Sequence, residues 1–286
     1  MFIVMGANGH VGSVVARTLL ERGEPVTVVT HDPDHGARWR DTGARVAVGD
    51  VRDAGSLRMV FVQGRRAFLL NPPADVATDT DAVERAGVAN ILAALEGARL
   101  EKVVAQSTAG AQRGERIGDL SVLWDLEEGL RRQPIPAAEN RAAFYMSNWD
   151  TQLERVRETG KLSTLFPADL KLPMAAPEDM GRIAADRLMS GTDEVGVRYV
   201  EGPDRYAATD VAAAFARALG RPVTVEVVPR QDWRAAYRAL GFSEAAADSF
   251  SRMTAASLDQ GFDRIVDPIR GTVSLEAYIE ALVARS

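Results

Sequence analysis

The chain has 286 residues, 46% of them hydrophobic, with a formal net charge of −6 and no cysteine. This length and composition predict one large or two modest globular domains, and the missing cysteines exclude disulfides and thiolate metal sites. The negative charge argues against a general nucleic-acid surface, and no apolar run is long enough to cross a membrane. Because an apolar strand begins at Phe2, leaving no room for a secretion signal, we expect a cytoplasmic protein.

The first predicted strand leads directly into three glycines, Gly6, Gly9 and Gly12, which are followed by an apolar helix pattern. Gly6 suits a tight strand-to-helix turn, Gly9 lets the backbone approach a pyrophosphate, and Gly12 lets the helix pack closely on the strand. The helix ends at Gly23 and a second apolar strand covers 26–29, which is the order of a βαβ unit. Since the free N–H groups of a helix start bind phosphate, we expect a dinucleotide here.

Strands and helices then alternate through the first half of the chain. The predicted strands are 45–48, 66–70, 102–106 and a sixth strand that contains residues 139–148, with helices at 54–62, 81–95 and 121–131. This alternation predicts an α/β fold with a doubly wound parallel sheet. The loop 109–118, which carries Arg113 and Arg116, is interpreted either as a lid over the bound cofactor or as an ordinary surface loop.

The second half has a different pattern of shorter elements. Strands are predicted at 197–201 and 223–228, and helices at 179–189, 210–219 with Thr209 as N-cap, 233–240, 243–258 and after Ser274. We expect a dinucleotide-binding domain over 1–150, to which a segment at about 176–200 returns. A smaller α+β domain that binds substrate or a partner would cover 151–286.

Several segments together resemble a known family. They are Gly6 to Gly12, Gly49-Asp50-Val51, Ser107-Thr108, residues 141–148, residues 173–179 and residues 200–203. The pattern is similar to the NmrA-like branch of the atypical short-chain dehydrogenase/reductases, and its second half looks like the quinone and azo-dye reductases of that branch. The resemblance implies a Rossmann sheet and an NAD(P)H-dependent oxidoreductase, which transfers hydride to a small conjugated, quinone-like or aromatic acceptor between the two domains.

Two alternatives stay open beside this interpretation. NmrA-type regulators imply a non-catalytic NAD(P) sensor whose small domain binds another protein. The second alternative is a biosynthetic enzyme of the same fold, with non-redox acid/base chemistry that uses Glu139 or Asp119. In each case we expect no nucleic-acid or membrane partner.

The resemblance also assigns cofactor contacts along the sheet edge. It implies that Asp50 and Val51 lie at the adenine, although Asp50 is equally suited to start the helix at Ala54. The remaining expected contacts are Asn8, Gly9, His10, Val11 and Gly12 at the pyrophosphate, Asn71 and Pro72 at the ribose nearest the nicotinamide, and Ser107 and Thr108 at the carboxyl edge of the sheet.

The sequence favours NADPH over NADH without excluding NADH. Asp32 stands 20 residues after Gly12, where an NAD enzyme places an acid, but it precedes a proline and suits the start of a turn. His31 occupies the position that the resemblance gives to an NADPH-binding arginine, and Arg38 follows closely with the geometry that a 2′-phosphate prefers. His31 and His35 lie in a turn-rich segment, so we expect no metal site.

The proton donor of many related reductases is missing. These enzymes pair a tyrosine with a lysine four residues later, and none of the five tyrosines here has that partner. Relatives that use a histidine or a lone lysine carry it on the same helix, where this chain has Asp119 and Leu123. The resemblance therefore leaves the source of a proton open.

Two other positions are candidates for catalysis. Glu139 and Asn140 stand in the sixth strand where relatives have apolar residues, and an unpaired carboxylate there costs several kcal/mol. One interpretation is that the strand is frayed, so that both residues are solvated or Glu139 pairs with a nearby arginine such as Arg141 or Arg132. The other is that Glu139 is a proton donor or substrate anchor with a raised pKa. Tyr145 and Trp149 follow at the exit of this strand, where rings pack between domains or stack on an aromatic substrate.

Overall fold

The computed structural model describes residues 1–259 and 266–285. Its centre is an eight-stranded sheet with the order β13-β10-β6-β5-β4-β1-β2-β3, in which every pair of neighbouring strands is parallel. The strands are β1 Phe2–Val4, β2 Val26–Thr30, β3 Arg45–Val48, β4 Arg66–Leu69, β5 Lys102–Thr108, β6 Ala137–Ala142, β10 Gly196–Glu201 and β13 Ile269–Arg270.

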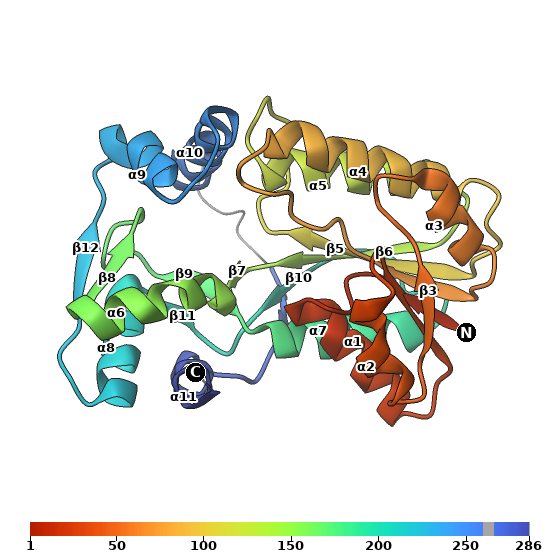
Figure 1. Cartoon of the computed structure of the whole chain (residues 1–286), viewed down its shortest axis with the longest axis horizontal. Helices are drawn as coiled ribbons and strands as arrows, with labels where there is room; N and C mark the ends of the chain where they lie inside the picture. The colour runs from red at the N-terminus through yellow and green to blue at the C-terminus, as the bar shows by residue number, and fades with distance from the viewer. Residues whose placement is uncertain (260–265, 286) are drawn as a thin grey trace.

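Helices cover both faces of this sheet (Figure 1). On one side lie α1 His10–Glu21, α2 Ala37–Arg40 and α7 Pro177–Met189, and on the other α3 Ala54–Phe61, α4 Thr80–Leu95 and α5 Asp119–Leu130. Successive residues of a strand point to opposite faces. Accordingly Phe2 and Val4 pack in the core under α1 and α7, whereas Ile3 packs in the core under α3, α4 and α5. The predicted α/β fold with a doubly wound parallel sheet is confirmed.

A smaller lobe lies beyond the carboxyl ends of the strands and has its own apolar core (Figure 1). It contains a three-stranded sheet, β11-β9-β7, and a parallel pair, β12 and β8. Its elements are β7 Phe144–Tyr145, α6 Leu153–Thr159, β8 Lys161–Thr164, β9 Leu172–Ala175, β11 Arg205–Tyr206, α8 Ala208–Leu219, β12 Thr224–Val227, α9 Trp233–Ala239, α10 Glu244–Asp259 and α11 Leu275–Arg285. Short 3-10 helices cover Met146–Gln152 and Arg230–Asp232 here, and Asp34–Gly36 after β2 of the large sheet.

The chain passes between the two parts several times. After β9, helix α7 packs against α1 and strand β10 joins β6 in the large sheet, and after α10 strand β13 pairs with β10. The predicted sixth strand is divided, because β6 stops at Ala142 and residues 144–145 pair with β9 instead. No helix within the described residues is long and apolar enough to cross a membrane.

The N-cap predicted at Thr209 is wrong by two residues. Helix α8 begins at Ala208, so Thr209 lies inside its first turn and Ala207 is the N-cap. The Asp210 carboxylate accepts a hydrogen bond from the Ala207 amide at 2.8 Å, so the N–H group of the N-cap residue has a partner.

Candidate functional site

The glycine turn joins β1 to α1 in the form that its sequence predicts. Gly6 has φ +66°, and a β-carbon on Gly12 would lie 2.3 Å from the Gly6 carbonyl oxygen, so both positions require glycine for the fold itself. Gly9 differs, because a β-carbon there would meet only the Gly6 oxygen, at 3.5 Å. Glycine is among the residues favoured at a helix start, and its open side here would also let a ligand approach the backbone closely.

The start of α1 is open to an anion. Gly9 is the N-cap, and no side chain caps the helix. His10 is exposed, whereas the Val11 side chain is buried in the core, so Val11 offers only its backbone amide. Free amides at a helix start favour negative charge, which fits the pyrophosphate of a dinucleotide.

A cavity of about 240 Å³ lies over this turn at the carboxyl ends of β1, β2, β3 and β4. Open α/β sheets bind their ligands at this edge. Of the residues expected to hold the cofactor, the cavity brings together Gly6, Asn8, Gly9, His31, Asp50, Val51 and Pro72.

Asn8 links the turn to the segment after β2. Its Oδ1 accepts hydrogen bonds from Arg38 Nη2 at 2.8 Å and from Trp39 Nε1 at 3.2 Å. The exposed guanidinium of Arg38 is thereby held beside the cavity, where it supplies positive charge for a phosphate. Asp32 accepts a hydrogen bond from the Asp34 amide at 2.9 Å, as expected of a residue that starts a turn.

Asp50 lines the cavity and is paired with its neighbour Arg52. The Arg52 guanidinium donates to both Asp50 oxygens, and this hydrogen bonding lowers the pKa of the Asp50 carboxyl. The capping role that was the alternative for Asp50 belongs to Asp53, which accepts from the Gly55 amide at 2.9 Å and begins α3. Asp50 is therefore ionised at neutral pH and available beside the cavity.

Asn71, Ser107 and Thr108 are among the expected contacts that do not line the cavity. Asn71 Nδ2 donates to the Glu84 carbonyl at 3.0 Å, so this side chain is turned toward α4, and its buried Oδ1 has no hydrogen-bond partner among the described residues. The Ser107 hydroxyl donates to Glu127 Oε1 at 2.6 Å and is 2% exposed. Thr108 is half-buried at the end of β5. The Ser107 hydroxyl is thus occupied by its hydrogen bond to α5, and the Thr108 side chain is the more accessible of the two.

Glu84, Asp119 and Tyr145 form an electrostatically coupled group at the same edge of the sheet. Burial and then the charge of Asp119 raise the pKa of Glu84 to about 7. The Asp119 side chain is exposed, and partial desolvation by the surrounding protein raises the pKa of its carboxyl above the usual value. Burial and then the Asp119 charge also raise the pKa of Tyr145. At pH 7 Glu84 is therefore about half protonated, whereas an ordinary glutamate would be ionised.

Asp119 stands at a position that the family resemblance singles out, whereas Glu84 is not among the site residues expected from the sequence. The signal for Glu84 is present in the predicted helix 81–95, because Glu84 stands on the same stripe as Val88 and Ile91, which are buried. An acid on the apolar stripe of a helix indicates a buried carboxyl. Its side chain is 6% exposed and accepts a hydrogen bond from the Ala74 amide at 2.9 Å.

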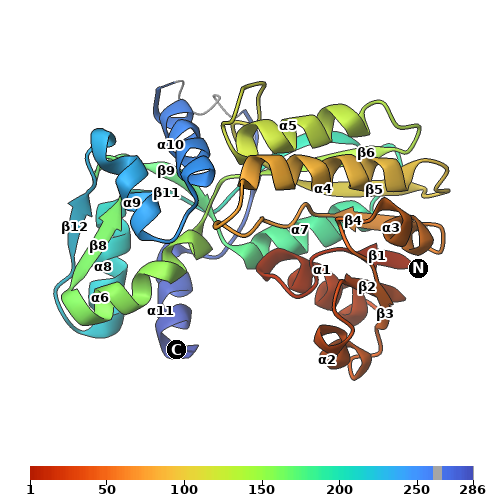
Figure 2. The ribbon, with the colours of Figure 1, turned by 45° about the horizontal axis from the view of Figure 1, so that its top comes forward.

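The loop 109–118 is attached at its second half to the smaller lobe. Arg116 donates to both oxygens of Asp79, at 3.1 and 3.2 Å, and to the Ala245 carbonyl of α10. The Gly118 amide donates to Ser249 Oγ of the same helix. Figure 2 shows α10 beside the starts of α4 and α5. The loop is therefore a contact between the two parts of the molecule, and Arg113 remains exposed in its first half.

Glu139 does not lie at the nucleotide cavity. It stands in β6 between β5 and β10 and lines a separate groove of about 500 Å³ near the amino ends of these strands. The expectation of a frayed strand is wrong, because Glu139 is 2% exposed and Asn140 fully buried in paired strands. The expected pairing with Arg141 is also absent, since Arg141 donates to Glu127 at 2.7 and 2.9 Å.

The aromatic residues after β6 divide between the two parts. The Phe144 ring lies 5.7 Å from Trp149 within the core of the smaller lobe, whereas Tyr145 packs against the core of the large sheet. Of these rings, only Tyr145 joins the group with Glu84 and Asp119. Its hydroxyl makes no hydrogen bond within residues 1–259 and 266–285, so it is free to donate to a ligand.

The comparison with protein-family models decides the family. The model of the NmrA-like family matches residues 1–280. The chain belongs to the NmrA-like family.

Proteins similar to this chain include reductases of dyes and quinones. An NAD(P)H azoreductase from Xenophilus azovorans is 22% identical over 94% of this chain and 91% of its own length. The triphenylmethane reductase of Citrobacter sp., solved with NADP(H), has a TM-score of 0.82 at 17% identity, covering 99% of this chain and all of that one. The NADPH-dependent quinone oxidoreductase of Escherichia coli, solved with NADPH, has a TM-score of 0.78 at 18% identity, covering 99% of both chains.

Proposed function

We propose that this NmrA-like protein is an NAD(P)H-dependent reductase of small conjugated acceptors, of the quinone, azo-dye or related aromatic kind. The observation that carries the proposal is the glycine at position 9, whose open side leaves room for a ligand at the free amides of α1. The azoreductase, the triphenylmethane reductase and the quinone oxidoreductase support the same chemistry.

NADPH is the proposed cofactor, with NADH as the weaker alternative. The residues fit a dinucleotide, since the turn from Asn8 to Gly12 would hold the pyrophosphate and Asp50 and Val51 the adenosine. Arg38, fixed by Asn8, would bind a 2′-phosphate, which only NADPH carries. When bound, the nicotinamide supplies the hydride.

The protein's own part in the reaction would be to position the acceptor and to supply a proton. We assign the proton to Asp119, because its raised pKa keeps it protonated at a pH where an ordinary aspartate is ionised. The ionised form of Asp119 would in turn raise the pKa of the neighbouring Glu84. Tyr145, whose pKa is raised, would donate a hydrogen bond to the acceptor. Glu139 has no part in this assignment.

Turnover tests the proposal directly. The purified protein is mixed with NADPH and with menadione, methyl red or crystal violet in turn, and the absorbance of the reduced nicotinamide is followed. We expect many turnovers with at least one acceptor. Tight NADPH binding without turnover of any acceptor would contradict the reductase and favour the non-catalytic sensor.

Asp119→Asn tests the proton source separately. In the wild type, kcat should fall as pH rises and Asp119 loses its proton, whereas the variant should be at least about tenfold slower and show no such fall. Glu115→Gln is the matched control, because Glu115 is an exposed acid of the adjacent loop. An unchanged pH profile in Asp119→Asn would remove Asp119 from the assignment without touching the cofactor site.

A further inference from the structure

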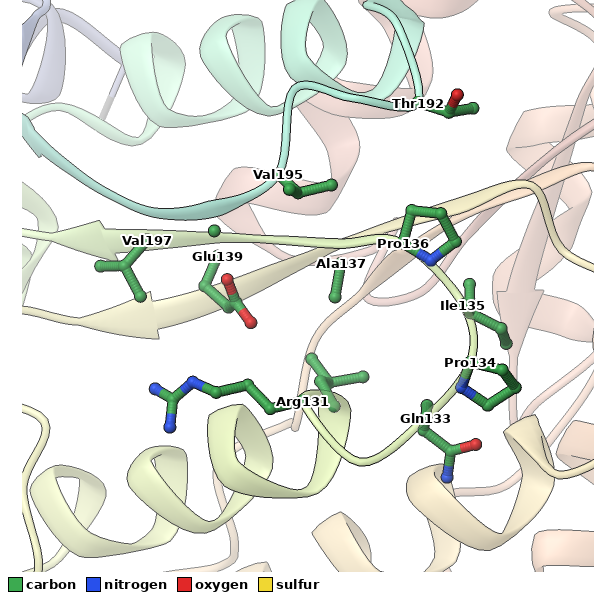
Figure 3. A pocket seen from close by; sticks show the side chains of 12 residues that line it. Arg131, Gln133, Pro134, Ile135, Pro136, Ala137, Glu139, Thr192, Val195 and Val197 are labelled. Carbon is green, nitrogen blue, oxygen red and sulfur yellow. The ribbon is translucent and has the colours of Figure 1, made fainter.

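The groove beside Glu139 is separate from the nucleotide cavity, and the two share no lining residue. Its floor is the start of β6 and β10, and its walls are the end of α5, the connection 133–136 and the loop before β10 (Figure 3). Apolar side chains line most of it, among them Ile135, Pro136, Val195 and Val197. Its volume of about 500 Å³ is enough for a small organic molecule.

Glu139 is the acidic group in the lining of this groove. Figure 3 shows its carboxylate directed into the space between β6 and α5. The residue is 2% exposed, and among residues 1–259 and 266–285 its carboxylate accepts no hydrogen bond and forms no ion pair. Its oxygens open onto the groove and are not fully enclosed. A cationic group bound in the groove could therefore pair with this carboxylate.

The nearby cations are engaged elsewhere. Arg131 of α5 is paired with Glu127 and Glu128. Arg187 of α7 donates to the Asn140 side chain, to the Glu139 carbonyl and to Glu194. Arg141, on β6 itself, forms its two-pronged contact with Glu127.

We propose that this groove is a second ligand site, which binds a small molecule with an apolar body and a protonated amine, the amine pairing with the Glu139 carboxylate. The apolar walls would cover the body of the ligand, and the ammonium would supply the hydrogen bonds that the carboxylate lacks. A carboxylate or phosphate ligand would be repelled by Glu139. The site does not depend on the proposed reductase activity.

Binding should depend on pH. Burial, followed by the charge of Glu127, raises the pKa of Glu139 to about 7, and the charges of Arg131, Arg187 and Arg141 oppose this rise. An amine that stays protonated pairs only with the ionised carboxylate. Its dissociation constant should therefore be roughly tenfold higher at pH 6 than at pH 8, as the ionised fraction of Glu139 falls.

Calorimetric titration of the full chain with benzylamine, in the absence of nucleotide, tests the site. We expect saturable binding at pH 8, the roughly tenfold loss at pH 6, and much weaker binding of the neutral benzyl alcohol. Glu139→Gln should abolish benzylamine binding. Glu96→Gln, which removes the same charge from an exposed position at the end of α4, should leave it intact.

Two further measurements keep the test independent of how well the Glu139→Gln variant folds. Val195→Trp fills the groove from its exposed loop and should block benzylamine without altering Glu139. In the wild type, the carboxyl carbon shift of Glu139 should report a lower pKa when benzylamine is added. Absence of binding at pH 8, equal binding by Glu139→Gln, or an unchanged Glu139 pKa would each overturn the proposal.

Discussion

The three glycines of the first turn have different steric reasons for being glycine. Gly12 is required by the backbone of the turn, because any β-carbon would collide with the Gly6 carbonyl. Gly9 has an ordinary extended conformation, with φ −93° and ψ −179°, and open space where its β-carbon would be. The fold itself therefore requires Gly6 and Gly12, whereas the open side of Gly9 leaves room for a ligand.

Alanine substitutions should separate these two reasons. Gly12→Ala should lower the free energy of unfolding by about 2 kcal/mol or more, because an added methyl group must displace backbone. Gly9→Ala should lower the free energy of unfolding by less than about 1 kcal/mol, because glycine and alanine differ only modestly at a helix N-cap. The same substitution should weaken NADPH binding at least about tenfold. Urea denaturation and NADPH fluorescence titration measure the two effects. Equal NADPH affinity in Gly9→Ala and wild type would contradict the proposal that the turn from Asn8 to Gly12 holds the pyrophosphate.

Single residues differ in how far the sequence predicts them. The glycine turn was predictable because its steric demands arise within seven consecutive residues. Glu139 and Asn140 were recognised as unusual, but their surroundings depend on which strands and helices flank β6. The sequence alone does not say that Arg141 pairs with Glu127 and so leaves the Glu139 carboxylate without this partner.

At the scale of elements, the loop 109–118 and helix α10 form one structural unit. Arg116 bridges Asp79, which is the N-cap of α4, and the Ala245 carbonyl of α10. Ser243 adds hydrogen bonds to the carbonyls of Val76 and Thr78. These contacts hold α10 over the edge of the sheet where Asp119 begins α5.

Loss of the Arg116 contacts should loosen this unit. Arg116→Gln should cost about 1 kcal/mol of stability, since it removes a two-pronged ion pair that is only partly exposed. Faster amide hydrogen exchange should appear in α10 and not in α8. Arg113→Gln, in the same loop but exposed, is the matched control and should leave exchange unchanged. Similar exchange in both variants would show that Arg116 does not hold α10.

The large sheet was largely predictable because its strands are apolar and alternate with helices of ordinary length. The strands of the smaller lobe were harder, since β7 and β11 have two residues each and β9 contains a proline. Such short strands carry no periodic pattern and form only because the surrounding core holds them in register. The same reason explains why β13, also two residues long, was not expected in the large sheet.

At the scale of the whole molecule, buried carboxyls should make stability fall as pH rises. The pKa of Glu139 and that of Glu84 are each raised from 4.5 to about 7. Between pH 4.5 and about pH 7, each of these carboxyls stays protonated in the folded protein but is ionised in the unfolded chain. The free energy of unfolding therefore decreases as the pH rises through this range. Each group contributes up to about 3 kcal/mol of this loss, at about 1.4 kcal/mol per pKa unit.

Glu139→Gln should remove the loss of stability at high pH that comes from ionising the buried Glu139 carboxyl. We expect the variant to be about 2 to 3 kcal/mol more stable than the wild type at pH 8 and equal to it at pH 5, by urea denaturation without added amine. Glu96→Gln should match the wild type at both pH values, because Glu96 is exposed. A Glu139→Gln variant that is less stable at pH 8 would mean that its carboxylate is already satisfied.

The repeated crossing of the chain between the large sheet and the smaller lobe limits how this protein can evolve or be engineered. Residues before 150 lack α7, whose Met180, Ala184 and Leu188 cover the same core as Val11 and Val15 of α1. They also lack β10 and β13, which complete the sheet beyond β6. The two parts are therefore not interchangeable modules, and the smaller lobe cannot be exchanged through a single recombination point.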